Sequence, residues 1–309
     1  MFEIIFLGTS ASAPSIKRNL TASMVLHKEY RFLIDCGEGT QRQLLRSGLG
    51  FKRLDKILLT HGHLDHILGL GGLASTFSRW DAIPKLEIYG GSWALERVRD
   101  LIFGVVFRGV KPPLQIDLIP MEPGILMEDD TFELSAFAVI HRGPGCLGYT
   151  FREKERRPFL VDKADAVGVP AGPERSRLVQ GETVTLADGT VVHPDQVLGP
   201  RVPGAKLVFV GDAARINNLI EEASNADALV IEATYLSKEE KLAREYGHLT
   251  ATEAATLARQ AGVRQLYLTH ISRRYSEEAI LAEAKAVFPK TVVVRDFDRF
   301  QIIKEKGLS

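Results

Sequence analysis

Short apolar runs separated by turn residues recur along the whole chain. Most are rich in β-branched or aromatic residues, which is typical of strands. The runs lie at residues 3–8, 23–27, 31–37, 55–61, 85–91, 131–141, 146–151, 205–212, 227–234, 265–270 and 291–297. The pattern predicts a strand at each of these positions.

Apolar positions three or four residues apart predict helices between some of these strands. These helices are expected at Thr40 to Ser47, Ala94 to Phe103, Ile216 to Ser224, Lys238 to Tyr246, Thr252 to Ala261 and Glu277 to Phe288. Two pairs, Ser237 with Glu240 and Thr250 with Glu253, have the spacing of a capping box. Strand and helix alternate after residue 200, so we expect two αβ halves packed around one core.

The pattern weakens between residues 152 and 203, where proline, glycine and charged residues accumulate. Only the segment around Asp188-Gly189 has the pattern of a hairpin. We interpret residues 152–203 as an arm inserted into a single domain that spans residues 1–309.

Composition and charge exclude some classes of protein. Hydrophobic residues make up 45% of the 309 positions and charged residues 25%, so disorder is not expected. Lys plus Arg equals Asp plus Glu at 39 each, so a nucleic-acid site would have to be a local basic patch.

No apolar run reaches the length of a membrane span, and no signal peptide is recognisable after Met1. Cys36 and Cys146 lack the spacing of a metal knuckle and are expected to be two buried thiols. The cytoplasm is the expected location. The segment at 7–14 lacks the lysine and glycine spacing of a P-loop, so no nucleotide cofactor is expected.

The segment His-Gly-His-Leu-Asp-His at 61–66 places four ligand-type side chains directly after a predicted strand. They are His61, His63, Asp65 and His66. A tight turn can direct two pairs of side chains to different sides, so that two cations share one loop. A solvated histidine-rich loop or a single structural zinc site is the alternative interpretation.

Three more ligand-type residues end apolar runs, namely His141, Asp212 and His270. An unpaired carboxylate after a strand as apolar as the one before Asp212 would be costly to desolvate. Asp212 is therefore expected to face a cation or hydrogen-bond donors. Function in open α/β sheets gathers at strand ends, which favours one shared site.

This order of ligands resembles the metallo-β-lactamase superfamily. The resemblance implies an α/β fold, a four-layer αβ/βα sandwich, and a site for two zinc ions per subunit, with manganese as the alternative metal. It implies that His61, His63 and His141 hold one ion, that Asp65, His66 and His270 hold the other, and that Asp212 bridges them.

Further segments are similar to ribonuclease Z, the endonuclease that removes the 3′ trailer from precursor tRNA. They include the N-terminal segment at 7–19, the segments at 35–44 and 60–73, Glu232 in Ile-Glu-Ala-Thr-Tyr, His248 in Gly-His-Leu-Thr, and the segment at 269–275. The resemblance implies a homodimer of the short form, hydrolysis of precursor tRNA and a 3′-hydroxyl product. It also implies a Gly-Pro type of arm that grips tRNA.

Roles follow from that resemblance and from the residues. Asp65 is the expected general base, and His248, oriented by Glu232, the expected proton donor to the leaving 3′-oxygen. A histidine that merely precedes a helix is the alternative for His248. The basic residues expected to contact phosphates are Arg152, Lys154, Arg156, Arg157, Arg175 and Arg177.

Ala213-Ala214 occupies the two positions where the family commonly has Thr-Arg. This departure puts in doubt the contacts that normally support the bridging Asp212. Two rival functions remain: a two-metal hydrolase of small molecules, such as a phosphodiesterase, and a metal-stabilised RNA-binding protein without turnover. The arm discriminates against the first rival, because a small substrate needs no basic protrusion.

Overall fold

The computed structural model describes residues 1–80 and 83–304. Within them the chain forms two compact units. The larger unit is built from Met1–Arg152 and from the chain from Ala205 onwards, and the smaller unit is Glu153–Gly204. Each unit is described by itself.

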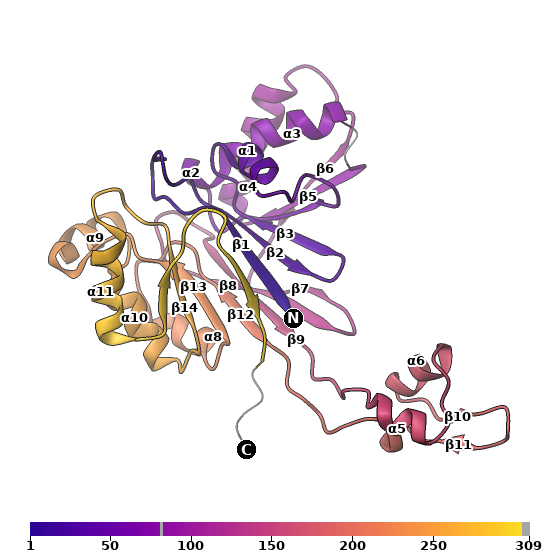
Figure 1. Cartoon of the computed structure of the whole chain (residues 1–309). Coiled ribbons are helices and arrows are strands. Elements are labelled where there is room, and N and C mark those ends of the chain that lie inside the picture. Colours follow the sequence, from indigo (N-terminus) through magenta and orange to yellow (C-terminus); the bar gives the residue numbers. More distant parts are fainter. Residues whose placement is uncertain (81–82, 305–309) are drawn as a thin grey trace. The chain divides into compact units, whose positions relative to one another are not determined.

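Two mixed sheets form the larger unit (Figure 1). In the described part of the chain the first sheet has the strand order β16-β1-β2-β3-β4-β5-β6. Its strands are β1 (Phe2–Gly8), β2 (Ala22–His27), β3 (Tyr30–Ile34), β4 (Lys56–Leu58), β5 (Lys85–Gly90), β6 (Gln115–Pro120) and β16 (Arg299–Ile302). From β3 to β6 neighbouring strands are parallel.

The second sheet has the order β15-β14-β13-β12-β9-β8-β7. Its strands are β7 (Gly124–Glu128), β8 (Phe132–Ala138), β9 (Leu147–Glu153), β12 (Lys206–Phe209), β13 (Ala228–Glu232), β14 (Leu266–Thr269) and β15 (Thr291–Val293). The strands β12 to β15 run parallel. Their carboxyl ends therefore lie at one edge of the sheet.

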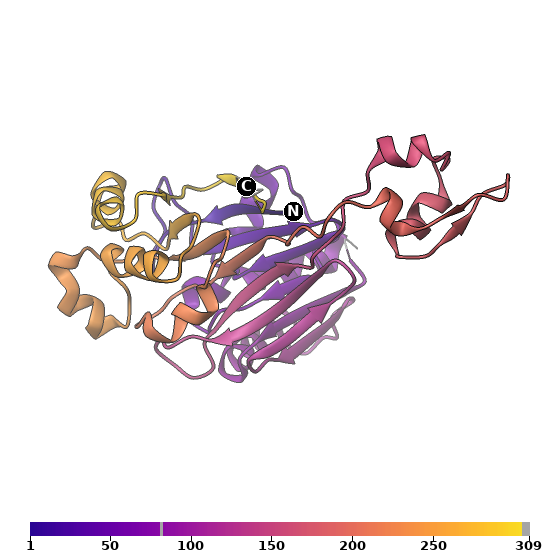
Figure 2. The same ribbon diagram turned by 90° about the horizontal axis from the view of Figure 1, so that it is seen from below.

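Alternating side chains on these strands produce three apolar layers. On β1, Ile4 and Phe6 belong to the core between the two sheets, whereas Ile5 and Leu7 belong to the core beneath the helices of the first sheet. Leu229 on β13 belongs to a third core, beneath the helices of the second sheet. Helix, sheet, sheet and helix thus stack in four layers (Figure 2), which confirms the predicted fold class.

The helices cover the outer faces of the sheets. On the first sheet they are α1 (Thr40–Arg46), α2 (Leu64–Ile67), α3 (Gly69–Trp80), α4 (Ser92–Arg99) and the π-helical turn η1 (Asp100–Val106). On the second they are η2 (Asn217–Leu219), α8 (Ile220–Ala223), η3 (Ser237–Glu239), α9 (Glu240–Tyr246), α10 (Ala251–Gln260) and α11 (Glu277–Val287). No described helix has both the length and the apolar character that a bilayer span requires.

The smaller unit has its own apolar core, which includes Ala164, Leu178 and Val197. Its elements are α5 (Val161–Ala166), α6 (Pro173–Val179), β10 (Val184–Thr185), β11 (Val191–Val192) and α7 (Pro194–Val197). The strands β10 and β11 pair antiparallel, which confirms the hairpin predicted around Asp188-Gly189.

One of the two predicted capping boxes is confirmed. The Thr250 hydroxyl accepts a hydrogen bond from the Glu253 amide at the start of α10, and the Glu253 carboxylate accepts from the Thr250 amide. The box predicted for Ser237 and Glu240 is wrong. The hydroxyl and amide of Ser237 both donate instead to Glu283 on α11, and α9 begins only at Glu240, after the short turn η3.

Candidate metal centre

The ligand-type residues lie where strands end. His61 follows β4, His141 follows β8 and Asp212 follows β12, each by three residues, and His270 directly follows β14. Because β12 and β14 are parallel neighbours of β13, their ends bring Asp212 and His270 together. The backbone of His270 is left-handed, with φ 54°, a strained conformation that is found preferentially at functional sites.

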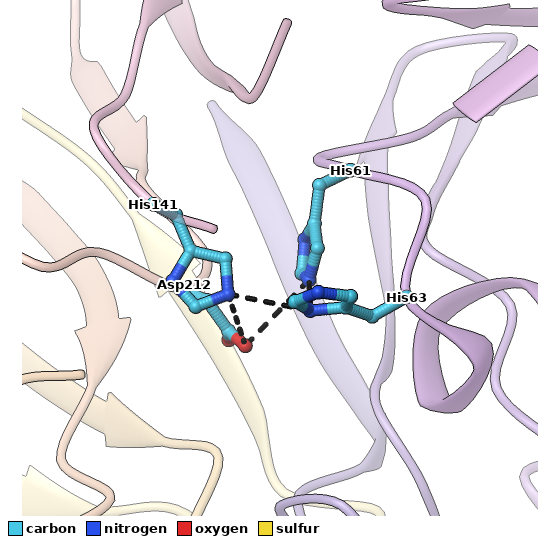
Figure 3. Close-up of side chains that lie close together, drawn as sticks. All are labelled: His61, His63, His141 and Asp212. Atoms are coloured by element: carbon cyan, nitrogen blue, oxygen red, sulfur yellow. Dashed lines mark hydrogen bonds and ion pairs between the residues drawn. The ribbon is translucent and has the colours of Figure 1, made fainter. Parts of the chain in front are cut away.

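Four side chains form the first group (Figure 3), and one ligand atom of each lies within 4.8 Å of the others. The group is His61, His63, His141 and Asp212. The Nδ1 atom of His63 is 2.8 Å from Nε2 of His61 and 3.3 Å from Nε2 of His141. Three imidazoles and one carboxylate thus converge on a common point.

Asp65, His66 and His270 form the second group. Nε2 of His270 lies 3.4 Å from Oδ2 of Asp65. The Oδ2 atom of Asp212 stands between the two groups, at 3.4 Å from Nε2 of both His66 and His270. It is also 3.8 Å from Nε2 of His61 and of His141. The structure therefore brings all seven predicted ligand residues together.

The donor set fits a cation. Ligand atoms around a tetrahedral ion with bonds of about 2.0–2.1 Å lie roughly 3.3 Å apart, close to the spacings of 2.8–3.4 Å found here. Nε2 of His66 and Oδ1 of Asp212 are buried without a hydrogen-bond partner. Such orphaned buried atoms are costly unless a ligand satisfies them, so these residues could hold metal ions.

Electrostatics support the same assignment. Burial lowers the pKa of His61 well below its usual value, and it lowers the pKa of His63 to about 4. Burial also lowers the pKa of His141. These imidazoles are therefore neutral near pH 7 and can offer lone pairs, which metal binding requires.

Around His66 and Asp212, attraction between opposite charges outweighs the effect of burial on the pKa. Burial disfavours a charge on His66, but Asp212 and Asp35 outweigh it and raise the pKa of His66 well above its usual value. Burial likewise opposes ionisation of Asp212, yet His270 and His66 hold its pKa well below its usual value. The field around Asp212 thus favours positive charge.

Asp35 holds two of the predicted ligands in position without being a ligand itself. The sequence analysis did not predict this role. Its Oδ2 accepts hydrogen bonds from Nδ1 of His66 at 2.8 Å and from the hydroxyl of Thr60 at 2.7 Å. Thr60 in turn contacts Nδ1 of His61 at 3.0 Å. Such outer contacts fix the tautomer and orientation of a ligating imidazole. The position of Asp35 at the end of an apolar strand was the available signal.

His248 and Glu232 form a pair beside the ligands. Nδ1 of His248 lies 3.0 Å from Oε1 of Glu232, and Glu232 is fully buried at the end of β13. Burial opposes protonation of His248, but Glu232 overcomes it and raises the pKa of His248 to about 9. His248 is therefore charged near pH 7.

The backbone after Asp212 explains why Ala213-Ala214 is tolerated. The amide of Ala213 donates to Oε1 of Glu232 at 2.7 Å. The amide of Ala214 donates to the carbonyl of Ile140, also at 2.7 Å. Main-chain groups make both contacts, so neither the contact with Glu232 nor the contact with Ile140 depends on the side chain at position 213 or 214.

Comparisons with known proteins agree with this geometry. Residues 2–103 match the family model described as anti-Pycsar protein Apyc1, and residues 182–271 match that of the beta-lactamase superfamily domain. The ribonuclease Z of Bradyrhizobium sp. (strain ORS 278) is 47% identical over 302 residues, which cover 98% of this chain and 100% of the relative. The chain belongs to the ribonuclease Z family. The ribonuclease Z of Listeria innocua is 40% identical, with 97% of this chain and 99% of the relative covered.

Solved structures agree with the ribonuclease Z assignment. Human tRNase Z, short form, superposes with a TM-score of 0.67 at 26% identity, over 97% of this chain and 99% of that one. The metallo-beta-lactamase fold protein YhfI from Bacillus subtilis superposes with a TM-score of 0.70 at 19% identity, over 97% of this chain and 100% of that one. The second likeness shows the fold alone.

In this ribonuclease Z family member, three of the six predicted phosphate-contacting residues have partners inside the smaller unit. Arg157 pairs with Asp195, Arg175 with Asp165, and Arg177 with Glu182. Arg152 and Arg156 are exposed, and Lys154 is half-buried. Exposed guanidinium groups are the better candidates for contact with a phosphate backbone.

Proposed function

We propose that this chain is a metal-dependent endoribonuclease that removes the 3′ trailer from precursor tRNA and leaves a 3′-hydroxyl. The observation that carries this proposal is the convergence of seven ligand-type side chains, Asp212 among them, in a member of the ribonuclease Z family. We further propose that the working enzyme is a cytoplasmic homodimer of the short form with a Gly-Pro type of arm. Both thiols are free and buried, as expected for a reducing compartment.

Two zinc ions fit the donor set best, with manganese as the alternative. His61, His63 and His141 would hold one, Asp65, His66 and His270 the other, and Asp212 both. Bound there, the ions would polarise a phosphodiester oxygen and lower the pKa of a water molecule towards neutrality.

Asp65 is placed to accept the proton of the attacking water. Its Oδ2 accepts a hydrogen bond from the amide of Ser12 at 2.9 Å, which fixes the direction of the carboxylate. Burial opposes ionisation, but the hydrogen bond to His270 and the charge of His66 lower the pKa of Asp65 below its usual value. Asp65 is therefore ionised before the reaction and can act as the general base.

His248 is placed to protonate the leaving 3′-oxygen of the ribose. Glu232 accepts from its Nδ1, so Nε2 of His248 carries the proton that is transferred. A ribose alkoxide is a poor leaving group without a proton, which gives this transfer its importance. Glu232 orients His248 and stabilises its charged form.

The arm at residues 152–203 is proposed to bind tRNA, with the exposed Arg152 and Arg156 as its first phosphate contacts. Lys154, Arg157, Arg175 and Arg177 are proposed as further contacts. Arg157 and Arg175 also donate hydrogen bonds to the carbonyls of Gly199 and Val169, which help to hold the smaller unit together.

Cleavage of a precursor tRNA that carries a 3′ trailer tests the proposal. Wild type supplied with zinc or manganese should cut after the discriminator base, and Asp65→Ala should not. Glu38→Ala serves as a matched control, because Glu38 is an exposed carboxylate outside the ligand groups. Steady hydrolysis of a small phosphodiester without RNA cleavage would favour the small-molecule hydrolase, and tight RNA binding without cleavage under either metal would favour the binding protein.

A further inference from the structure

A cavity of about 480 Å³ opens beside the candidate metal centre. Four residues of the proposed reaction line it, namely His63, Asp65, Asp212 and His248. Two arginines, Arg97 and Arg142, also line it. These two arginines have no part in the functions assigned above.

Arg97 is fixed beside His63. It lies on α4, and its Nη1 donates to the carbonyl of Gly62 at 2.8 Å. Its guanidinium lies 5.3 Å from the centroid of the Trp93 ring, and that ring meets the His63 ring edge-on at 5.6 Å. One backbone contact and one aromatic face therefore hold the guanidinium and leave most of its N–H groups for a ligand.

Arg142 lies on the side of His248. It directly follows His141, and its guanidinium lies 6.0 Å from the centroid of the Tyr246 ring. Its stem packs on Gly247, where an added Cβ would come within 2.9 Å of Cγ of Arg142. Gly247 also has the left-handed φ of 70° that favours glycine. The backbone next to His248 is thus shaped to accommodate this arginine.

Neither guanidinium has a counter-ion within the structure. Among residues 1–80 and 83–304, no carboxylate oxygen lies within the 4.0 Å of an ion pair from Arg97 or Arg142. The buried carboxylates nearby already face the imidazoles of the metal centre. Two unpaired cations on a concave surface attract an anion, and a guanidinium fork matches the oxygens of a phosphate.

We propose that Arg97 and Arg142 bind the two phosphates that flank the scissile phosphate in the single-stranded 3′ end of the RNA. This inference rests on the proposed function. The scissile phosphate would lie at the metal centre, and the two arginines line the same cavity beside different residues of it, Arg97 next to His63 and Arg142 next to His248. The two guanidinium groups set the path of the strand across the cavity.

Arg97→Met and Arg142→Met, each compared with wild type, test the assignment. The control is Arg99→Met, because Arg99 is exposed on the same helix and does not line the cavity. One substrate is a precursor tRNA with a trailer, and the other is bis(4-nitrophenyl) phosphate, which has no flanking phosphate. Each substitution should lower kcat/KM for the tRNA by about 10- to 100-fold more than for the small diester, mainly through KM. Arg97→Lys should restore part of the loss.

Binding gives a second readout that needs no turnover. A trailer RNA with a non-hydrolysable linkage at the cleavage position is titrated onto the metal-loaded protein at several salt concentrations. Each substitution should reduce the slope of log affinity against log salt by about 0.7, the value for one lost phosphate contact in a single strand. Arg99→Met should leave the slope unchanged.

An unchanged salt slope in Arg97→Met and Arg142→Met would overturn the assignment. Equal losses on both substrates would overturn it too, because they would show that the arginines support the metal centre. Failure of the proposed function has a different signature, namely a wild type that cuts no RNA. The salt slopes of the binding experiment would still decide the role of the arginines in that case.

Discussion

Asp35 accepts a hydrogen bond from Nδ1 of His66 at 2.8 Å, and both side chains are fully buried. The contact directs Nε2 of His66 towards Asp212. Asp35 also holds the hydroxyl of Thr60, which contacts the imidazole of His61. Asp35, which is not itself among the seven predicted ligands, thus orients a histidine from each of the two proposed metal sites, His66 directly and His61 through Thr60.

Asp35→Asn should weaken metal binding by about 10- to 100-fold, the usual effect of losing such an outer partner. An amide oxygen can keep the contacts of Oδ2 with His66 and the Thr60 hydroxyl, but the amide nitrogen then faces the backbone N–H of Thr60, which donates to Oδ1 at 2.8 Å in the wild type. Competition with a zinc-binding dye measures the affinity. Asp117→Asn is the control, because Asp117 on β6 pairs with Lys85 on β5 and is not among the predicted ligands. Wild-type affinity in Asp35→Asn would refute the supporting role.

The sequence predicted His61, His141, Asp212 and His270 as ligands because each follows an apolar strand, and it predicted the other three because they share the segment at 61–66 with His61. Because β12, β13 and β14 are parallel neighbours, Asp212 and His270 come together at one edge of the sheet. The role of Asp35 was not predicted because it depends on contact with His66, which lies 31 positions further along the chain. Local pattern cannot show that contact.

Local pattern was also insufficient elsewhere, as α3 and Ser237 illustrate. The helix α3 was not predicted, since Gly69, Gly71 and Gly72 weaken the periodicity of its first turn. Its apolar residues, such as Leu70 and Phe77, nevertheless pack into the core of the first sheet. In the case of Ser237 a distant carboxylate, Glu283, replaced the predicted local partner. At α3 and at Ser237, contacts with distant parts of the chain outweighed the local sequence preference.

Glu283 joins the two ends of the segment that carries His248. Its carboxylate accepts from the amide and hydroxyl of Ser237 at 2.9–3.1 Å, and from those of Thr252 at 3.0–3.2 Å. Glu283→Gln leaves one acceptor for four donors, so we expect a loss of about 1–3 kcal/mol in the free energy of unfolding. Thermal denaturation measures the change.

The matched control for Glu283 is Lys285→Gln, an exposed position on the same helix. It should leave the melting temperature unchanged. If Glu283→Gln behaves like this control, the hydrogen bonds of Glu283 to residues 237 and 252 do not stabilise the native state.

Arg152 and Arg156 are exposed. Replacing both with glutamine should raise KM for precursor tRNA and lower the salt dependence of binding by about 0.7–0.9 per lost contact. Hydrolysis of bis(4-nitrophenyl) phosphate should stay at the wild-type rate, because this substrate needs no remote anchor. Arg259→Gln on the exposed face of α10 is the control. An unaltered KM for tRNA in the double variant would remove these two residues from the RNA interface.

His248 offers the sharpest separation of two catalytic steps. If it protonates the leaving 3′-oxygen, His248→Ala should lower kcat for precursor tRNA by about 100- to 10,000-fold, the usual contribution of a positioned acid. The loss should be far smaller with bis(4-nitrophenyl) phosphate, because nitrophenolate departs without a proton. Asp65→Ala should impair both substrates, since both require an activated water.

Glu232→Gln extends the His248 experiment. The amide keeps a contact with Nδ1 of His248 but loses the negative charge that raises the pKa of this histidine to about 9. A lowered pKa means that less of His248 is protonated as pH rises, so tRNA cleavage should fall at a lower pH in Glu232→Gln than in wild type. Rate profiles between about pH 6 and 10 measure the difference. Equal losses on both substrates in His248→Ala, with an unchanged pH profile in Glu232→Gln, would show that the pair only supports the fold around His141 and Asp212.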